Sequence, residues 1–287
     1  MKKINYAFWG SDEFSIGVIE ELYKINIIPS VIITVPPQPK GRKAVLTPTS
    51  LSLWADEKGI KVLSPKAFDD EFLSVYSNLQ LDIAVVASYG KIIPNEILEI
   101  PRMKTLNIHP SLLPLWRGSS PIQNTILHSN IAGVSIMLLD EKMDHGPILG
   151  NATIPLPDSN EEVPTYIELR DRLALEGGKL LAVLLPKWLD GTVTATDQDH
   201  SKATFTKILT KKDGLIDLSD DPVKNLRIIR AMNPWPGAYF IHKRKNAEIR
   251  VSVKSAHIEN GELILERIVP EGKKEMDFES FKRGYLN

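Results

Sequence analysis

Strand-like and helix-like segments alternate through the first half of the chain. Short apolar runs at Ile4–Trp9, Val31–Val35 and Leu81–Ala87 predict buried strands. Residues 13–24 and Leu51–Lys58 carry the apolar spacing of helices. A strand that is followed by a helix and then by another strand favours a parallel sheet with helices on both faces. The sequence therefore predicts an α/β fold with a Rossmann-like, mostly parallel sheet.

The pattern changes in the second half of the chain. Residues 160–190 are predicted to form one long helix that closes the first domain. The stretch after this helix is rich in Gly, Thr, Asp, Gln and Ser, which is typical of a linker. Short strand-like runs such as Glu262–Ile268 follow. We therefore expect a first domain over residues 1–190, a linker over 191–206 and a small β-rich domain over 207–287.

Composition excludes several kinds of chemistry. The chain contains no cysteine, which excludes disulfides, thiolate zinc sites and a thiol nucleophile. It has no run of about 18 apolar residues that would span a membrane, and no apolar signal core near Met1. We therefore expect a cytoplasmic protein with no membrane partner. Residues 191–287 carry 17 Lys and Arg against 14 Asp and Glu, whereas residues 1–190 carry 18 against 22. This basic C-terminal third points to a polyanionic partner, with chance as the alternative.

Two polar side chains leave the predicted strand Lys104–Ile108 together. Strand side chains alternate with a period of two, so Asn107 and His109 emerge on the same face. Pro110 cannot donate to a strand ladder and is expected to end the strand. Ligand sites in open α/β sheets favour the carboxyl ends of the strands. This pair is therefore a candidate for chemistry at the edge of the sheet.

An acidic loop supplies a third polar group. Asp140–Gly146 follows the apolar run Val134–Leu139 and includes Asp144. A carboxylate beside an imidazole keeps the ring charged and orients it, and an asparagine amide can donate to a developing oxyanion. Asn107, His109 and Asp144 together suit acyl transfer to an amine without a covalent enzyme intermediate. The alternative is structural: a capping asparagine, a hydrogen-bonded histidine and a surface turn.

These residues belong to a longer motif that resembles the folate-dependent formyltransferase family. The motif combines Asn107-x-His109 and Asp144 with the run Ser-Leu-Leu-Pro-x-x-Arg-Gly-x-x-Pro-Ile over residues 111–122. Further matching segments extend over nearly the whole chain: Phe8–Phe14, Ala87–Pro94, Asp213–Asp217 and Arg230–Gly237. The last two resemble the start of the C-terminal domain in the members that act on a tRNA. The resemblance implies that this domain is a small, OB-like β-barrel.

The resemblance also implies substrates and site residues. It implies 10-formyltetrahydrofolate as the formyl donor, initiator methionyl-tRNA as the acceptor, no metal, and a monomer. Asn107, His109 and Asp144 become the catalytic trio. The residues expected to bind the folate are Val86, Ala87, Ser88, Tyr89, Gly90, Ser111, Leu112, Leu113, Pro114, Leu139, Asp140 and Met143. The residues expected to contact the other substrate are Gly10, Ser11, Lys40, Arg42, Lys43, Arg117 and Gly118.

The basic residues of the second set lie in a stretch rich in proline and glycine. Pro36–Thr49 is predicted to be a loop. Lys40, Arg42 and Lys43 would hold acceptor-stem phosphates, because such contacts dominate nucleic-acid affinity. The alternative is a solvated loop with no partner.

One departure from the family keeps rival functions open. The strands that normally follow Ala256 look shortened, which favours a formyltransferase of an amino-sugar nucleotide or a purine precursor. A protein that binds or hydrolyses formylfolate without an acceptor is a further alternative.

Overall fold

The structure is a computed structural model that describes residues 4–41, 44–157, 162–244 and 247–285. It divides into two compact units that interleave along the chain. The first unit comprises Met1–Arg117, Gly133–Ile154 and Arg170–Phe205, and the second comprises Gly118–Ala132, Pro155–Leu169 and Thr206–Asn287. The second unit includes two earlier segments of the chain, and in the first of them helix α5 (Pro121–His128) packs against helix α7 (Pro222–Met232). The domain boundaries expected from the sequence stay a prediction.

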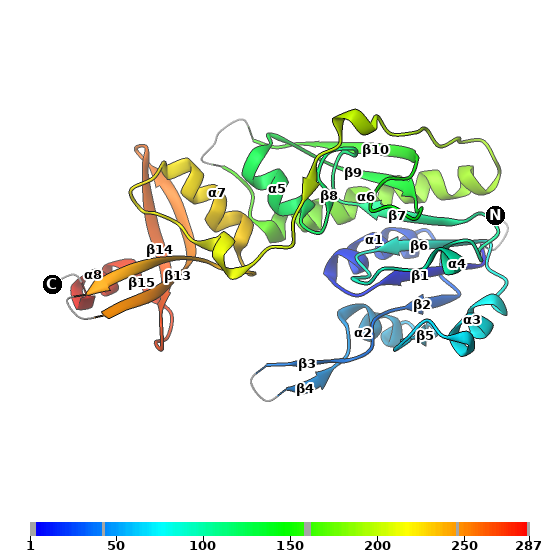
Figure 1. The fold of residues 1–287 in the computed structure, drawn as a ribbon, viewed down its shortest axis with the longest axis horizontal. Coiled ribbons are helices and arrows are strands. Elements are labelled where there is room, and N and C mark those ends of the chain that lie inside the picture. Colours follow the sequence, from blue (N-terminus) through cyan, green and yellow to red (C-terminus); the bar gives the residue numbers. More distant parts are fainter. Residues whose placement is uncertain (1–3, 42–43, 158–161, 245–246, 286–287) are drawn as a thin grey trace. The chain divides into compact units, whose positions relative to one another are not determined.

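A seven-stranded sheet forms the centre of the first unit (Figure 1). Its strand order is β10-β9-β7-β6-β1-β2-β5. Strands β1, β2, β5, β6 and β7 run parallel, and β9 pairs antiparallel with β7. The predicted α/β fold with a mostly parallel sheet is therefore confirmed. The strands are β1 (Tyr6–Gly10), β2 (Val31–Ile33), β5 (Val62–Leu63), β6 (Ile83–Ala87), β7 (Thr105–His109), β9 (Ile131–Leu138) and β10 (Ile148–Pro155).

An aromatic cluster covers one face of this sheet. Trp9 of β1 meets Tyr76 and Tyr89 edge to face, with ring centroids 5.4 and 5.0 Å apart. The Trp9 indole N–H also donates to the buried hydroxyl of Tyr76 at 3.2 Å. Helices α3 (Asp70–Ser77) and α4 (Asn95–Leu98) contribute the apolar side chains that pack beside them. Neither of these two short helices was predicted above.

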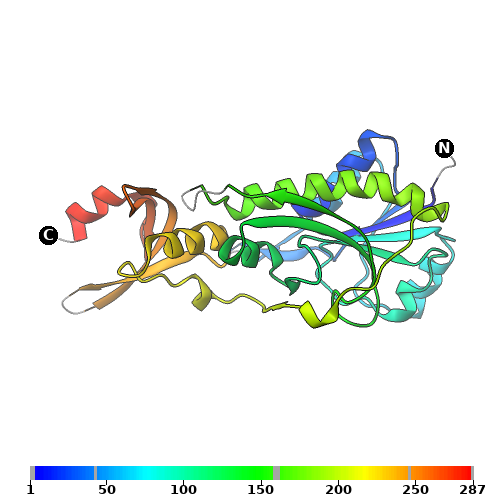
Figure 2. The same ribbon diagram turned by 90° about the horizontal axis from the view of Figure 1, so that it is seen from above.

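Helices α1 (Glu13–Lys24) and α6 (Tyr166–Leu189) cover the opposite face. Figure 2 shows α6 as the long yellow-green helix lying along the sheet. The two helices pack closely because each has a glycine where it meets the other helix. A Cβ on Gly178 would lie 2.6 Å from the Val18 carbonyl oxygen, and one on Gly17 would lie 2.7 Å from the Ala174 Cβ. The predicted long helix is confirmed from Tyr166 onward.

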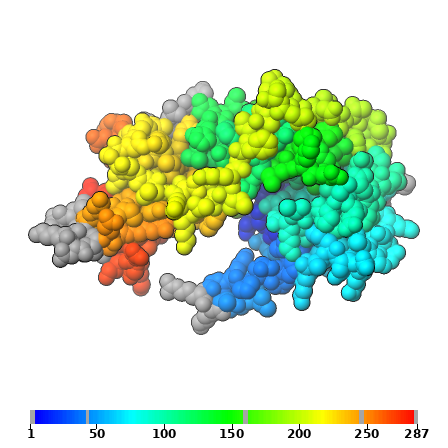
Figure 3. All heavy atoms as spheres, in the orientation of Figure 1, coloured from blue at the N-terminus to red at the C-terminus, as the bar shows by residue number. Residues whose placement is uncertain are grey.

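The predicted loop Pro36–Thr49 is wrong in part, because it contains a two-stranded ribbon. Strand β3 (Gln38–Lys40) pairs antiparallel with β4 (Val45–Thr47). Proline is tolerated at sheet edges, and both strands of a lone ribbon are edges, so Pro39 does not prevent pairing. Figure 3 shows the ribbon in blue, standing out from the residues around it. Helix α2 (Ser50–Glu57) follows, and the Thr49 side chain caps it by accepting from Ser52 N at 3.0 Å.

The second unit contains a separate antiparallel sheet of four strands in the order β12-β13-β14-β15. These strands are β12 (Ala238–Arg244), β13 (Ala247–Glu259), β14 (Glu262–Pro270) and β15 (Met276–Asp277), and α8 (Phe278–Tyr285) follows them. Closure of this sheet into an OB-like barrel stays a prediction. The remaining short elements are β8 (Arg117–Gly118), β11 (Phe205–Thr206) and 3-10 turns at His200–Lys202 and Lys211–Gly214. Across the described part of the chain, no helix combines the length and the apolar character that a membrane crossing requires.

Candidate active site

Asn107 and His109 lie near the C-terminal end of strand β7, on the same face of the sheet. Asn107 stands between Val86 of β6 and Met137 of β9, and His109 stands beside Ser135 of β9. Val86 packs in the same apolar cluster as the aromatic rings described above. Both polar side chains therefore project on the side of the sheet that α3 and α4 cover. Among the described residues, the half-buried Asn107 amide makes no hydrogen bond, which leaves its N–H groups available as donors.

His109 lies between two acceptors, one at each ring nitrogen. Its Nε2 lies 3.1 Å from the main-chain oxygen of Trp116, and its Nδ1 lies 3.5 Å from Oδ1 of Asp144. The side chain is only 6% exposed. A carbonyl and a carboxylate only accept hydrogen bonds, so the imidazolium is the one form that presents an N–H to both neighbours. The two contacts therefore fix the orientation of the ring.

The loop that carries Asp144 closes tightly on strand β9. Pro147 O accepts from Leu138 N at 2.9 Å, and a Cβ on Gly146 would lie 2.0 Å from the Leu138 carbonyl oxygen. Only glycine permits so close an approach. Asp144 itself has a left-handed backbone with φ of 50°. This closed turn brings the Asp144 carboxylate back over the sheet to His109.

The segment 111–115 is fastened to the same strand. The Ser135 hydroxyl is fully buried, accepts from Leu113 N at 3.0 Å and donates to Ser111 O at 2.7 Å. The Ser111 hydroxyl donates in turn to Leu115 O at 2.6 Å. Ser111–Pro114, which were predicted to bind the folate, are therefore held beside His109 by hydrogen bonds that secondary structure does not supply.

The predicted folate segment Val86–Gly90 is tied to the predicted turn Gly10–Ser11. The Ser11 hydroxyl donates to Tyr89 O at 3.1 Å, and the Ser88 hydroxyl donates to Asp12 Oδ2 at 2.5 Å. Tyr89 is buried, and burial raises the pKa of its hydroxyl to about 12. Within the described ranges this hydroxyl has no hydrogen-bond partner. The two segments thus form one connected wall at the ends of β1 and β6.

The third predicted folate segment contributes unevenly. Leu139 packs against the aromatic cluster that contains Val86 and Tyr89, so the structure brings these two segments together. Asp140 pairs instead with its neighbour His145, Oδ2 to Nδ1 at 2.8 Å. Met143 is 63% exposed. Leu139 therefore completes an apolar wall, and Met143 stands at the surface.

The described members of the predicted acceptor-contacting set differ in their surroundings. Arg117 is only 3% exposed, and its guanidinium donates to Gln198 Oε1 and to the Nδ1 nitrogen of His200. Gly118 has a left-handed φ of 109° and lies against the Thr206 main chain. Lys40 is exposed on strand β3. The other two predicted residues, Arg42 and Lys43, lie outside the described residues.

Gln198 and His200 are site residues that the sequence did not reveal. Both lie in the polar stretch that was expected to be a linker, yet Gln198 is 6% exposed. Its Nε2 donates to the carbonyl oxygens of Asp144 and Gly146 at 2.9 and 2.7 Å. The His200 ring stacks on His145, with centroids 4.0 Å apart and planes 5° apart. A polar residue in a Gly/Thr/Asp-rich stretch carries no signal that marks it as buried.

The sequence matches two parts of one enzyme family. Residues 18–183 match the formyl transferase family, and residues 208–263 match the formyl transferase C-terminal domain. This chain belongs to the formyltransferase family. A methionyl-tRNA formyltransferase of Chloroflexus aurantiacus is 41% identical over 252 residues, which is 87% of this chain and 80% of that protein. Another from Roseiflexus castenholzii is 34% identical over 304 residues, 98% of this chain and 96% of that protein. The expected membership is therefore confirmed, and the chain is a formyl-transferring enzyme.

Solved structures of formyltransferases share the fold. A methionyl-tRNA formyltransferase from Clostridium thermocellum superposes with a TM-score of 0.61 at 16% identity, over 96% of this chain and 99% of its own. A 4-N formyltransferase from Francisella tularensis gives 0.67 at 17% identity, over 90% and 99%. A sugar N-formyltransferase from a Shewanella species gives 0.64 at 16% identity, over 92% and 99%. At these identities the likeness concerns the fold alone.

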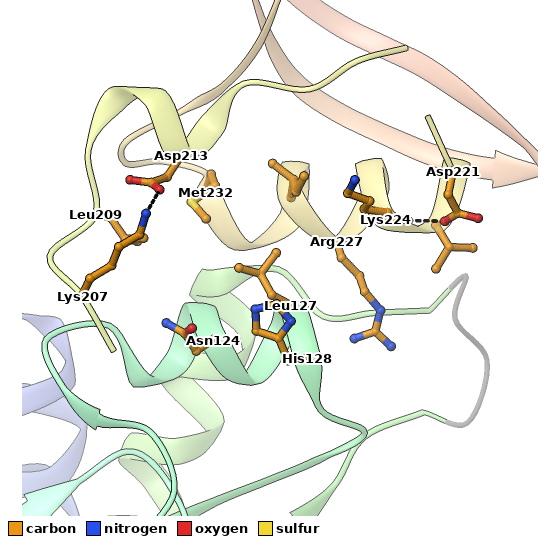
Figure 4. A pocket seen from close by; sticks show the side chains of 12 residues that line it. Asn124, Leu127, His128, Lys207, Leu209, Asp213, Asp221, Lys224, Arg227 and Met232 are labelled. Atoms are coloured by element: carbon orange, nitrogen blue, oxygen red, sulfur yellow. Dashed lines mark hydrogen bonds and ion pairs between the residues drawn. The ribbon is translucent and has the colours of Figure 1, made fainter. Parts of the chain in front are cut away.

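The second unit of this formyltransferase has a pocket of its own, of about 660 Å³, between helices α5 and α7 (Figure 4). Cationic side chains reach it, but they are engaged locally. Lys207 pairs with Asp213, and Arg227 donates to the Ile126 and Ser129 carbonyl oxygens at 2.6 and 3.4 Å. None of the predicted site residues lines this pocket. Among the described residues, no group of three or more His, Asp or Glu side chains is arranged to hold a metal ion.

Proposed function

We propose that this enzyme transfers the formyl group of 10-formyltetrahydrofolate to the amino group of methionyl-tRNA for translation initiation. One observation carries the proposal: His109 lies beside Asp144 at the end of β7, on the strand that also presents Asn107. This arrangement occurs in a chain whose relatives over most of its length are methionyl-tRNA formyltransferases.

The proposed reaction needs no covalent enzyme intermediate. The neutral amine of the acceptor attacks the formyl carbon, and the carbonyl electron pair moves to oxygen. The Asn107 amide and the His109 imidazolium stabilise this oxyanion, because donors fixed in advance stabilise developing charge most effectively. The oxyanion then collapses, the bond from carbon to the folate nitrogen breaks, and that nitrogen takes up the proton that the amine loses, through water. Asp144 keeps the His109 ring charged and oriented throughout.

The folate is proposed to bind along the wall formed by the ends of β1 and β6. A pterin ring is flat, and its edge carries donors and acceptors. Val86, Tyr89 and Leu139 offer an apolar surface for the face of such a ring, and the backbone of the exposed residues Ser88 and Gly90 offers hydrogen bonds to its edge. The loop Ser111–Pro114, fastened by Ser135, is proposed to close the other side.

The tRNA is proposed to be held by basic residues outside this wall. Strand β3 carries exposed Lys40. Arg42 and Lys43 follow it in the sequence, before β4. Residues 191–287 carry a net charge of +3, from 17 cationic and 14 anionic side chains. Such groups displace counterions from phosphates. We also propose that the enzyme is a cytoplasmic monomer.

A sister activity on an amino-sugar nucleotide is the second candidate. The observation in its favour is the fold shared with sugar N-formyltransferases. The same catalytic trio would serve that reaction, or one on a purine precursor. A protein that hydrolyses formylfolate without any acceptor would also use it.

One assay separates these functions. Purified enzyme is given 10-formyltetrahydrofolate and, in separate reactions, methionyl initiator tRNA, an amino-sugar nucleotide, or no acceptor. We expect tetrahydrofolate release that depends on the charged tRNA, together with formyl-methionine on the tRNA. Formylation of the sugar nucleotide without formylation of the tRNA would reject the tRNA assignment and keep the formyl-transfer chemistry. Equal turnover without acceptor would reject both.

A further inference from the structure

Residues 196–204 form a brace that is hydrogen-bonded to the segments around Asp144 and Trp116. At one end, Thr196 exchanges two main-chain hydrogen bonds of 2.8 Å with Ile148. At the other end, Thr204 holds the loop before β8. Its carbonyl oxygen accepts from Arg117 N at 2.9 Å, and its hydroxyl accepts from Trp116 N at 2.8 Å. The brace is therefore fixed at both ends to segments that carry partners of His109.

Gln198 lies in the middle of the brace and points inward. Its Nε2 donates to the carbonyl oxygens of Asp144 and Gly146 at 2.9 and 2.7 Å. Its Oε1 accepts from Nε and Nη2 of Arg117 at 3.2 and 2.6 Å. Carbonyl oxygens only accept and a guanidinium only donates. The amide therefore fits in one orientation, and all four of its contacts are made in that orientation.

These contacts fasten the turn that carries Asp144. Asp144 has a left-handed backbone with φ of 50°, a conformation that few residues other than glycine, asparagine and aspartate adopt. The two donors of Gln198 fasten the carbonyls on either side of His145. With those carbonyls fixed, the Asp144 carboxylate is kept facing Nδ1 of His109 at 3.5 Å.

We propose that Gln198 is a positioning residue for formyl transfer. It sets the Asp144 carboxylate against one ring nitrogen of His109, while the same brace, through Thr204, sets the Trp116 carbonyl against the other. This role rests on the proposed function of the catalytic trio. Gln198 touches neither substrate, and its effect on the reaction passes through Asp144.

The test compares two side-chain amides that each donate to two main-chain carbonyl oxygens. Gln198→Met keeps the length of the side chain and removes its polar atoms. Asn5→Leu is the matched control, because the Asn5 amide also donates to two carbonyl oxygens, those of Leu79 and Gln80 at 2.9 and 3.0 Å, at the opposite end of the sheet. We expect Gln198→Met to lower kcat about 10- to 100-fold, the scale of a displacement of about 1 Å at a reacting centre. KM for 10-formyltetrahydrofolate should stay within about threefold, and Asn5→Leu should keep wild-type kcat.

A double-mutant cycle separates positioning from a general loss of stability. If Gln198 acts through Asp144, then adding Gln198→Met to Asp144→Asn should lower kcat by less than about threefold, since the position it sets no longer carries a charge. A repeat of the full loss in that background would overturn the proposal. So would a Gln198→Met enzyme with wild-type kcat.

A second variant tests which contacts of Gln198 matter. Gln198→Glu keeps an acceptor for Arg117 and replaces the two donors, so we expect its kcat to fall as in Gln198→Met. Wild-type kcat in Gln198→Glu would overturn the proposal, because the donors to Asp144 and Gly146 would then be dispensable. Failure of the proposed function looks different: Asp144→Asn alone would keep wild-type kcat. A fall in Asp144→Asn without a fall in Gln198→Met rejects only the positioning role.

Discussion

Asp144→Asn removes one charge from the centre and little else. Asparagine has the size of aspartate and tolerates a left-handed backbone, so the turn with φ of 50° should persist. The bonds from Gln198 go to main-chain oxygens of the turn and are unaffected. The lost contact is the attraction across 3.5 Å between the carboxylate and the His109 ring, whose side chains are 13% and 6% exposed.

The size of the effect follows from that distance. With an effective dielectric constant of about 20, two unit charges at this separation attract by roughly 5 kcal/mol. Each 1.36 kcal/mol is about a tenfold change in rate, so the full attraction corresponds to a loss of roughly 3000-fold. The Trp116 carbonyl still faces Nε2 and still holds the ring in place. We therefore expect kcat to fall by between about 100-fold and about 3000-fold, with KM for 10-formyltetrahydrofolate little changed.

The assay is steady-state formylation of methionyl initiator tRNA at saturating folate, with thermal unfolding as a check on the fold. Asp82→Asn is the matched control. Its carboxylate pairs with Arg102 at 3.0 Å, near the start of β6 and away from the site, so that variant should keep wild-type kcat. Wild-type turnover of folded Asp144→Asn would show that the charge of Asp144 does not support His109 in the reaction.

Three further predictions concern the same enzyme. His109→Ala should lower kcat severely and leave the fold intact, because a donor that acts in the transition state is removed; near-normal turnover of the purified variant would take His109 out of the centre. Tyr89→Phe should raise the free energy of unfolding by about 1 kcal/mol in urea titrations, since a buried hydroxyl without a partner among the described residues is removed. This gain should be constant below about pH 10, where the tyrosine is neutral in both the folded and the unfolded chain, and a loss of stability would mean that the hydroxyl has a partner. Replacing Lys40, Arg42 and Lys43 together with alanine should weaken use of the tRNA and flatten the salt dependence of tRNA binding, with folate binding retained. An unchanged salt slope would show that these side chains do not contact phosphates.

The extent of the sheet in the second unit bears on the choice of acceptor. If it lacks the extent needed to hold a tRNA, basic residues elsewhere must carry more of the affinity, and the salt slope of the triple variant would then fall most of the way toward zero. A sugar nucleotide carries few charges, so an enzyme for that acceptor should have a shallow salt slope from the start. The slope of the wild-type enzyme therefore separates the two acceptors before any variant is made.

Local periodicity in the sequence was enough to predict the main sheet and the placement of two catalytic candidates, Asn107 and His109. The alternation of apolar runs with helical spacing was enough to predict the parallel sheet, because each strand and helix carries its own pattern. The period of two along β7 was enough to place Asn107 and His109 on one face. The pairing strand β3 was missed because Pro39 and Gly41 indicate a loop, whereas a ribbon with two edges accepts them.

Tertiary structure decided what surrounds His109. The distance between His109 and Asp144 depends on a turn that requires glycine at position 146. A Cβ on Gly146 would lie 2.0 Å from the Leu138 carbonyl oxygen. The partner that fastens this turn, Gln198, stands 54 residues from Asp144 and 81 residues from Arg117 along the chain. No pattern in the stretch around Gln198 distinguishes a buried amide from a solvated one, because burial there comes from distant segments and not from neighbours in sequence. The sequence therefore determines which chemistry the strand end can offer, and only the folded chain determines which groups hold that chemistry in place.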